Sequence, residues 1–307
     1  MSTSVFIDGA VGTTGLEIRE RLADRPEIAL VVLDEARRKD HAARREALND
    51  CDVAILCLPD DAAREAVTLI GNPRTKVIDA STAHRVAEGW TYGFAELAPE
   101  QAARIAGASR VANPGCYPTG FLALVAPLVR AGLIGSHAYL SVNAASGYSG
   151  GGKSMIAEYE GAASPPAFRA YALALAHKHV PEMTRHAGLT HPVVFQPAVA
   201  NTYRGMVVEV PLHLGAVGHP PLSALADALR AAYPGPLVRV ADGDAQTISI
   251  EADAGTDRMT LHVRGNPEAG QARLVATLDN LGKGAAGAAV QNLNLMAGLD
   301  PLAGLTL

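Results

Sequence analysis

The sequence predicts an α/β protein with a doubly wound parallel sheet of the Rossmann type, followed by an α+β domain. Three observations support this. Short apolar runs alternate with helical stretches over residues 1–115, a glycine-rich turn follows the first run, and longer alternating runs dominate after Cys116. Strands that alternate with helices are typical of βαβ units and a parallel sheet. A chain of 307 residues has room for two domains of ordinary size.

The first domain is expected over residues 1–115. Its helices are expected over residues 61–70 and 99–106. Its strands are expected at residues 4–7, 28–33, 53–58, 76–79 and 110–112.

The second domain is expected over residues 116–282, with a long apolar helix over residues 120–133. Its alternating runs predict a mixed or antiparallel sheet with strands at residues 138–145, 193–199, 205–214, 237–241, 259–263 and 273–279. The Ala-rich tail predicts a helix over residues 284–295. Residues 283–307 are expected to complete the first domain.

Composition and charge limit the classes of partner. The net charge is −5, and no run of Lys and Arg is long enough to form a basic patch, so a nucleic-acid partner is not expected. No apolar stretch reaches the ~18 residues of a membrane span, so no membrane partner is expected either. The sequence has three cysteines, a small and odd number that does not suggest a disulfide framework. With no signal-like leader at the N-terminus, the expected location is the cytoplasm.

A phosphate-binding turn is predicted at the N-terminus. Gly9, Gly12 and Gly15 follow an apolar strand and precede a helix, in the spacing G-x-x-G-x-x-G. In this context glycines let backbone N–H groups approach a pyrophosphate, and Thr13 within the turn is expected to join them. A glycine-rich turn that binds no nucleotide is the alternative.

The second strand indicates which dinucleotide is bound. It ends at Asp34, and Arg37, Arg38 and Lys39 follow. An acidic residue at this place holds a ribose 2′-OH, whereas a nearby Arg accommodates a 2′-phosphate. The basic triplet favours NADP, with Arg37 and Arg38 as the 2′-phosphate ligands. The alternative is a solvated cluster of surface charges.

A reactive cysteine is predicted at Cys116, within the segment Asn-Pro-Gly-Cys-Tyr-Pro-Thr-Gly over residues 113–120. The Asn-Pro-Gly turn places this thiol at the start of an apolar helix, where the helix dipole lowers a thiol pKa. The alternative is a small buried cysteine, which suits Cys51 and Cys57 better. That pair lacks the C-x-x-C spacing of a metal site, and no metal is expected.

A cysteine nucleophile needs a proton partner. His177 and His179 form the one close histidine pair in the sequence, although a structural pair on a loop is the alternative. Pro181 disfavours the α region for Val180, so the chain is expected to leave helical geometry near His179. That places His179 at a helix end or in a loop, which favours it for proton transfer and leaves His177 to bind substrate or orient its neighbour.

With these residues in order, the chain resembles the short form of the N-acetyl-γ-glutamyl-phosphate reductases, over nearly its whole length. The motifs that carry the resemblance lie at residues 9–15, 79–85, 113–120, 145–152, 177–182, 201–205 and 284–292. They also separate the chain from the related aspartate-semialdehyde dehydrogenases. Residues 83–85 read Ala-His-Arg where longer members carry an Asp-Phe-Arg-type segment, which leaves the substrate contacts open.

The resemblance implies roles for individual residues. Cys116 matches the nucleophile, and the segment with His177 and His179 supplies the acid/base. Arg85 and Arg204 are expected on the phosphate and α-carboxylate of the substrate, because a guanidinium matches either oxyanion. The remaining expectations are a substrate contact for Asn113 and cofactor contacts for Ser146, Gly147 and Asn292.

The implied activity is NADPH-dependent reduction of an acyl phosphate to an aldehyde through a cysteine thioester, by a homo-oligomer that is a dimer or a tetramer. Four other readings remain. They are an aspartate-semialdehyde dehydrogenase, a reductase of another N-modified acyl phosphate, a cysteine hydrolase, and a non-catalytic NADP-binding sensor. A hydrolase has no need of the nucleotide fingerprint, and a sensor has no need of Cys116.

Overall fold

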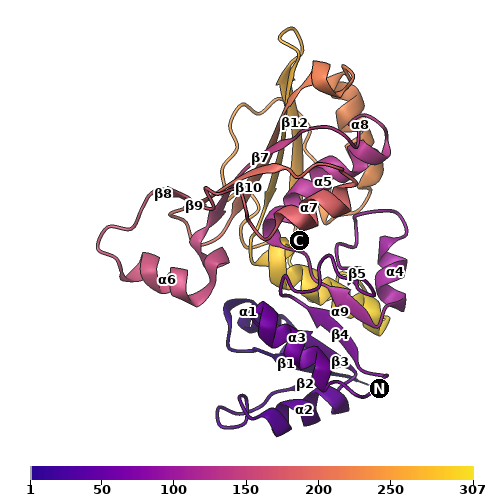
Figure 1. Ribbon diagram of the computed structural model, residues 1–307, viewed down its shortest axis with the longest axis vertical. Coiled ribbons are helices and arrows are strands. Elements are labelled where there is room, and N and C mark those ends of the chain that lie inside the picture. The colour runs from indigo at the N-terminus through magenta and orange to yellow at the C-terminus, as the bar shows by residue number, and fades with distance from the viewer. Residues whose placement is uncertain (1) are drawn as a thin grey trace. The chain divides into compact units, whose positions relative to one another are not determined.

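The computed structural model describes residues 2–307, which divide into two compact units (Figure 1). The first unit runs up to Ala95 and includes Glu100–Gly115 and Ala285–Leu305. The second consists of Glu96–Pro99, Cys116–Gly284 and Thr306–Leu307. The short Glu96–Pro99 stretch has no counterpart in the sequence prediction, which assigned it to the first domain.

The first unit is built on a six-stranded sheet that is parallel throughout, in the order β2-β1-β3-β4-β6-β5. Its strands are β1 (Thr3–Asp8), β2 (Ile28–Val31), β3 (Val53–Leu56), β4 (Lys76–Asp79), β5 (Thr91–Tyr92) and β6 (Arg110–Ala112). This confirms the predicted doubly wound fold. Strand β3 ends before the expected residue 58, because Pro59, which has no N–H for a ladder, caps the next helix.

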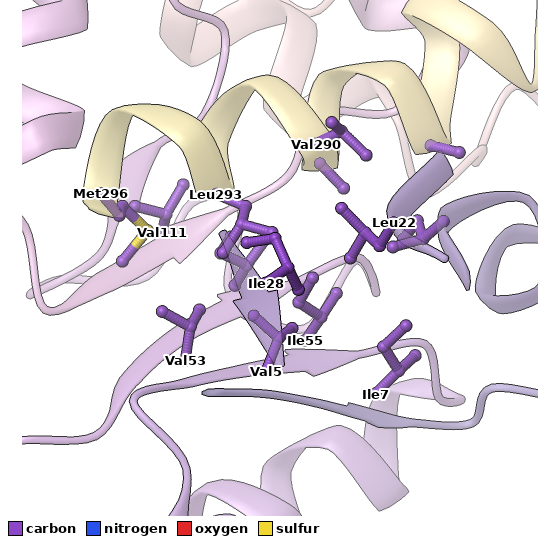
Figure 2. Packing of buried hydrophobic residues seen from close by; sticks show 14 of the residues in the cluster. Val5, Ile7, Leu22, Ile28, Val53, Ile55, Val111, Val290, Leu293 and Met296 are labelled. Carbon is purple, nitrogen blue, oxygen red and sulfur yellow. The ribbon is translucent and has the colours of Figure 1, made fainter. Parts of the chain in front are cut away.

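Helices cover both faces of this sheet. They are α1 (Thr13–Leu22), α2 (His41–Asp50), α3 (Asp60–Leu69), α4 (Gln101–Gly107) and α9 (Gly287–Ala297). Figure 2 shows Val290 and Leu293 of α9 above Val5 and Ile55 of the sheet. Helices α2 and α3 pack on a second cluster that includes Phe6. Apolar burial on both sheet faces explains why the strands read as continuous apolar runs.

The second unit contains a seven-stranded mixed sheet in the order β11-β12-β13-β10-β7-β9-β8. Its strands are β7 (Ser141–Gly147), β8 (Phe168–Ala170), β9 (Val194–Ala200), β10 (Met206–His213), β11 (Val238–Val240), β12 (Met259–Asn266) and β13 (Gln271–Leu278). Its helices are α5 (Cys116–Arg130), α6 (Gly152–Gly161), α7 (Val180–Ala187) and α8 (Leu222–Ala232), and short turns of 3₁₀ or π type are η1 (Tyr148–Gly151), η2 (Leu214–Val217) and η3 (Gly282–Ala286). This confirms the predicted α+β class.

One face of the mixed sheet is covered by helices and the other is open. Val208 of β10 lies against α5 at Gly120, whereas its neighbours Val207 and Glu209 line an apolar cavity of about 960 Å³ on the opposite face. Adjacent strand residues point to opposite faces, so the cavity and α5 lie on different sides of the sheet. Over residues 2–307, no helix combines the length and apolarity needed to span a membrane.

Candidate active site

Cys116 is the first residue of α5. The helix therefore starts four residues before the predicted position, because Pro118 falls in the first turn, where a missing N–H breaks no helical bond. The residue is partly exposed, as Cys57 is, whereas Cys51 is buried. At a helix N-terminus the positive end of the helix dipole favours a thiolate and a developing oxyanion.

Tyr117 follows Cys116 in the chain, and its ring lies near both histidine rings. Its ring centroid lies 6.3 Å from that of His177 and 5.9 Å from that of His179. Its hydroxyl accepts a hydrogen bond from the Tyr171 hydroxyl at 3.3 Å. Burial above all, with an added contribution from Cys116, raises the pKa of Tyr171 to about 12. Cys116, the two tyrosines and the two histidines thus form one cluster within the second unit.

His177 is held as a neutral hydrogen-bond donor. The backbone N–H of His179 donates to its Nδ1 atom at 3.1 Å, so the neutral ring carries its proton on Nε2. Burial, helped by the charge of Lys178, lowers the pKa of His177 to about 4. At neutral pH the ring can donate from Nε2 but carries no charge, which suits binding better than proton transfer.

His179 occupies the N-cap position of α7, with φ −84° and ψ −14°, and is 7 % exposed. The expected position of His179 at a helix end is confirmed, but the expectation that the chain leaves helical geometry there was wrong, since a helix begins at this residue. Pro181 falls in the first turn of α7, where proline is compatible with a helix. His179 is therefore fixed at the start of a helix, with its ring 4.7 Å from that of His177.

Ser146, Gly147 and Arg204 gather in a second group within the same unit. The N–H of Gly147 donates to the carbonyl of Gly205 at 2.8 Å, which places the end of β7 beside the Arg204 loop. Arg204 is partly exposed and lies 3.6 Å from the buried Asp279 carboxylate. Burial raises the pKa of Tyr117 and the Ser146 side chain acts in the opposite direction, so this group adjoins the Cys116 cluster.

The glycine-rich turn of the first unit forms one wall of a cavity of about 580 Å³. Gly9 has φ +93°, and a Cβ atom there would lie 2.2 Å from the carbonyl oxygen of Cys57. Among the described residues, the buried Thr13 hydroxyl has no hydrogen-bond partner. Arg38 and Lys39 line the same cavity. A glycine cradle, an unsatisfied hydroxyl and two cations fit a phosphate-bearing dinucleotide.

Comparison with known proteins agrees with this geometry. Residues 4–105 match the semialdehyde dehydrogenase NAD-binding domain, and residues 116–280 match the semialdehyde dehydrogenase dimerisation domain. An N-acetyl-gamma-glutamyl-phosphate reductase of Mesorhizobium japonicum is 51 % identical over 97 % of this chain and 100 % of its own length. One of Pseudomonas putida, named N-acetyl-gamma-glutamyl-phosphate reductase 2, is 50 % identical over 96 % of both chains. The chain belongs to the N-acetyl-γ-glutamyl-phosphate reductase family.

Solved structures of other semialdehyde dehydrogenases share the fold of this reductase family member. Aspartate semialdehyde dehydrogenase II of Vibrio cholerae aligns with a TM-score of 0.75 at 18 % identity, over 97 % of this chain and 99 % of that one. The enzyme of Candida albicans, solved with NADP, aligns with a TM-score of 0.68 at 16 % identity, over 96 % of this chain and 97 % of that one. At these identities the likeness concerns the fold alone.

In this reductase family member the two predicted 2′-phosphate arginines are separated. Arg38 lines the cavity and pairs with Glu35 in the same wall, whereas Arg37 is not among the lining residues and pairs with Glu46 at 3.0 Å. Sequence reasoning missed Arg44, which also lines the cavity and binds the Asp8 carboxylate at 2.9 Å. Arg44 was not predicted to line the cavity because it lies on α2, a helix with a largely polar sequence that was itself not predicted.

Arg85, Asn113 and Asn292 form a buried network in the first unit. The Arg85 Nε atom donates to the carbonyl of Asn113 at 2.9 Å, and a terminal nitrogen donates to that of Ala80 at 3.0 Å. Asn292 donates to the Asn113 side chain at 3.0 Å. These contacts hold the turn that leads into Cys116. They give no support to the expected substrate contacts of Arg85 and Asn113 or the cofactor contact of Asn292.

Sequence reasoning also missed the pair formed by His84 and Asp79. The His84 Nδ1 atom lies 2.6 Å from an Asp79 carboxylate oxygen, and its ring stacks on Trp90 with centroids 4.1 Å apart. Both residues lie in the motif at residues 79–85, from which only Arg85 was singled out. Asp79 also accepts hydrogen bonds from Ser81, so the motif folds as a compact buried turn.

Proposed function

We propose that this chain reduces N-acetyl-γ-glutamyl phosphate to N-acetylglutamate semialdehyde with NADPH, releasing phosphate, as a step of arginine biosynthesis. The observation that supports this most is the cluster of Cys116 at a helix N-terminus with His177 and His179. The names of relatives about 50 % identical over nearly the full length support the choice of substrate. The dinucleotide cradle in the first unit supports a reduction rather than a hydrolysis.

The first half of the reaction forms a thioester on Cys116. Its thiolate sulfur attacks the acyl carbon, and the carbonyl oxygen becomes an oxyanion. Backbone N–H groups at the start of α5 stabilise that charge, an effect worth about 3 kcal/mol per donor in comparable sites. Phosphate leaves with the electron pair of the broken C–O bond. Arg204, partly exposed and close to Cys116's cluster, binds the carboxylate or phosphate of the substrate.

The second half converts the thioester to the aldehyde. Bound NADPH supplies the hydride. His177, neutral and protonated on Nε2, donates a hydrogen bond to the substrate and holds it in place. His179 gives a proton to the oxygen of the thiohemiacetal and takes it back as the C–S bond breaks. The Cys116 thiolate is restored and the semialdehyde leaves.

The preference for NADPH is assigned to Arg38. Arg38→Ala is expected to weaken NADPH binding by about 10- to 100-fold and NADH binding little, because a charge-assisted bond to the 2′-phosphate is lost. Fluorescence titration with both cofactors measures this. Arg37→Ala is the matched control, since Arg37 pairs with Glu46 outside the cavity, and should bind both normally. Equal losses for the two cofactors in Arg38→Ala would place the 2′-phosphate elsewhere.

In this proposal the two units have different roles. The first, including α9, binds NADPH, and the second binds substrate and carries self-association. The dimerisation-domain match supports a homo-oligomer, a dimer or a tetramer. The open sheet face is the proposed contact, since it exposes large apolar side chains such as Phe168 at 63 % and Val194 at 43 %. Three free cysteines support a cytoplasmic location.

A two-substrate assay tests the function. Phosphate-dependent reduction of NADP is followed with N-acetylglutamate semialdehyde and, in parallel, with aspartate semialdehyde. The proposal expects turnover with the first and little with the second. Preference for aspartate semialdehyde would make the chain an aspartate-semialdehyde dehydrogenase. Tight NADPH binding without turnover of either would favour a cofactor sensor.

A further inference from the structure

Residues 279–284 form a short segment of the second unit that contacts two parts of the candidate site. They follow β13 and run into the π-helical turn η3. π-Helical turns are rare and often occur at functional sites. The first residues of the segment contact the Arg204 loop, and Gly284 contacts Cys116. One continuous stretch of chain therefore connects the proposed anion-binding arginine with the nucleophile.

Asp279 organises this segment. Its carboxylate is fully buried, and a buried charge requires partners. One oxygen accepts the N–H groups of Leu281 and Gly282, at 2.7 and 2.8 Å. The other accepts the N–H of Gly255 at 2.6 Å and lies 3.6 Å from the Arg204 guanidinium.

Asn280 holds the same loop from its other side. Its Oδ1 atom accepts the N–H of Gly205 at 3.0 Å, and its Nδ2 atom donates to the Ser149 hydroxyl at 2.8 Å. Ser149 in turn donates to the carbonyl of Tyr203. The residues before and after Arg204 are thus both tied to the segment, so the guanidinium is fixed by its backbone and by Asp279.

Gly284 forms part of the wall beside Cys116. Its N–H donates to the backbone carbonyl of Asp279 at 2.9 Å. A Cβ atom at this position would lie 2.8 Å from the Cys116 Cβ atom, closer than real Cβ atoms approach one another. The turn that Asp279 caps therefore sets how closely the chain passes the nucleophile.

We propose that Asp279 is a positioning residue for the reaction. It holds the Arg204 guanidinium ready for the carboxylate or phosphate of the substrate, and it holds the turn that places Gly284 against Cys116. This rests on the proposed function, which gives Arg204 an anionic group to bind. A long, partly exposed arginine samples many rotamers, so an anchored one loses less conformational entropy when substrate binds.

The test is Asp279→Asn, which keeps the shape and an oxygen acceptor but removes the charge. The KM for N-acetylglutamate semialdehyde or for phosphate is expected to rise about 10- to 100-fold, in line with the loss of a charge-assisted contact. Arg204→Gln should raise the same KM. The double variant should be no worse than the poorer single variant, because the two residues act as one unit. The affinity for NADPH should stay at the wild-type value.

Asp253→Asn is the matched control. Asp253 is also buried, but its carboxylate accepts the hydroxyls of Thr260 and Thr277 instead. It should lose stability while keeping wild-type KM values. A folded Asp279→Asn enzyme with wild-type KM values would overturn the proposal.

If Asp279→Asn does not fold, Asn280→Ala replaces it, since it releases the Arg204 loop at Gly205. A raised KM supports the proposal and a wild-type KM overturns it. Arg204→Gln distinguishes a failure of the proposed substrate role of Arg204 from a failure of the positioning role of Asp279. If that variant keeps wild-type KM values, the proposed substrate role of Arg204 fails. If it raises KM while Asp279→Asn does not, only the positioning role fails.

Discussion

Cys116→Ser is expected to lower kcat by at least about 10³-fold, as loss of a covalent nucleophile does in comparable enzymes. A serine hydroxyl at the start of α5 stays protonated at neutral pH and attacks an acyl carbon poorly. Steady-state kinetics measure the loss. NADPH binding should be unchanged, because the dinucleotide cradle belongs to the first unit. A serine variant with near-normal turnover would refute the thioester mechanism.

Alkylation of the wild-type enzyme provides the control for this prediction. Burial is the main cause that raises the pKa of Cys51 to about 11 and of Cys57 to about 12, so both stay as unreactive thiols near neutral pH. Cys116 is partly exposed at a helix N-terminus. Iodoacetamide should therefore label Cys116 first and abolish activity in step with that labelling. Inactivation that follows labelling of Cys51 or Cys57 would contradict the assignment.

His179→Asn is expected to lower kcat by about 10²- to 10⁴-fold, the usual contribution of general acid/base catalysis. Asparagine can hold a hydrogen bond but cannot exchange a proton. The pH–rate profile of the variant should therefore lose one limb that the wild-type enzyme shows. Measuring kcat across pH in both proteins tests this.

His177→Asn is the matched comparison from the same segment. The pKa of His177 lies at about 4, so the ring is neutral above pH 5 and cannot produce a limb near neutral pH. Its loss should raise KM and leave the shape of the profile unchanged. If His177→Asn removes the limb and His179→Asn raises KM, the two roles are exchanged. Wild-type pH behaviour in both variants would remove the segment from the mechanism.

Much of the fold was predictable because buried strands and helices leave regular patterns of apolar residues in the sequence. Strands β4 and β6 begin and end at the predicted residues, because buried parallel strands give continuous apolar runs between polar loops. Helices α2, α6, α7 and α8 were missed. Helices α7 and α8 do have a buried apolar face, so their signal was present and was not recognised. Helices α2 and α6 bury few residues, and in α6 Tyr159 alone is buried. Without an apolar stripe a helix has no periodic signal to read.

The parts of the candidate site that are formed by residues close together in the sequence were predictable. The turn before Cys116 and the glycine-rich loop are encoded by neighbouring residues, and the structure places both at helix N-termini. Contacts between residues far apart in the sequence have no local sequence pattern from which they could be predicted. Arg85 bonds to the carbonyl of Asn113, 28 positions away, and Asp279 pairs with Arg204 at the adjoining ends of the neighbouring strands β13 and β10. An arginine in a motif looks the same whether it binds a ligand or a carbonyl, and only the fold distinguishes them.

The thioester mechanism requires Cys116 to carry the acyl group. Mixing the enzyme with N-acetylglutamate semialdehyde and NADP in the absence of phosphate should stop the reverse reaction at the thioester. The account predicts one NADPH formed per active site and one N-acetylglutamyl group on the Cys116 peptide by mass spectrometry, removed when phosphate is added. Formation of NADPH with no acyl group on Cys116, or acylation of a residue other than position 116, would contradict it.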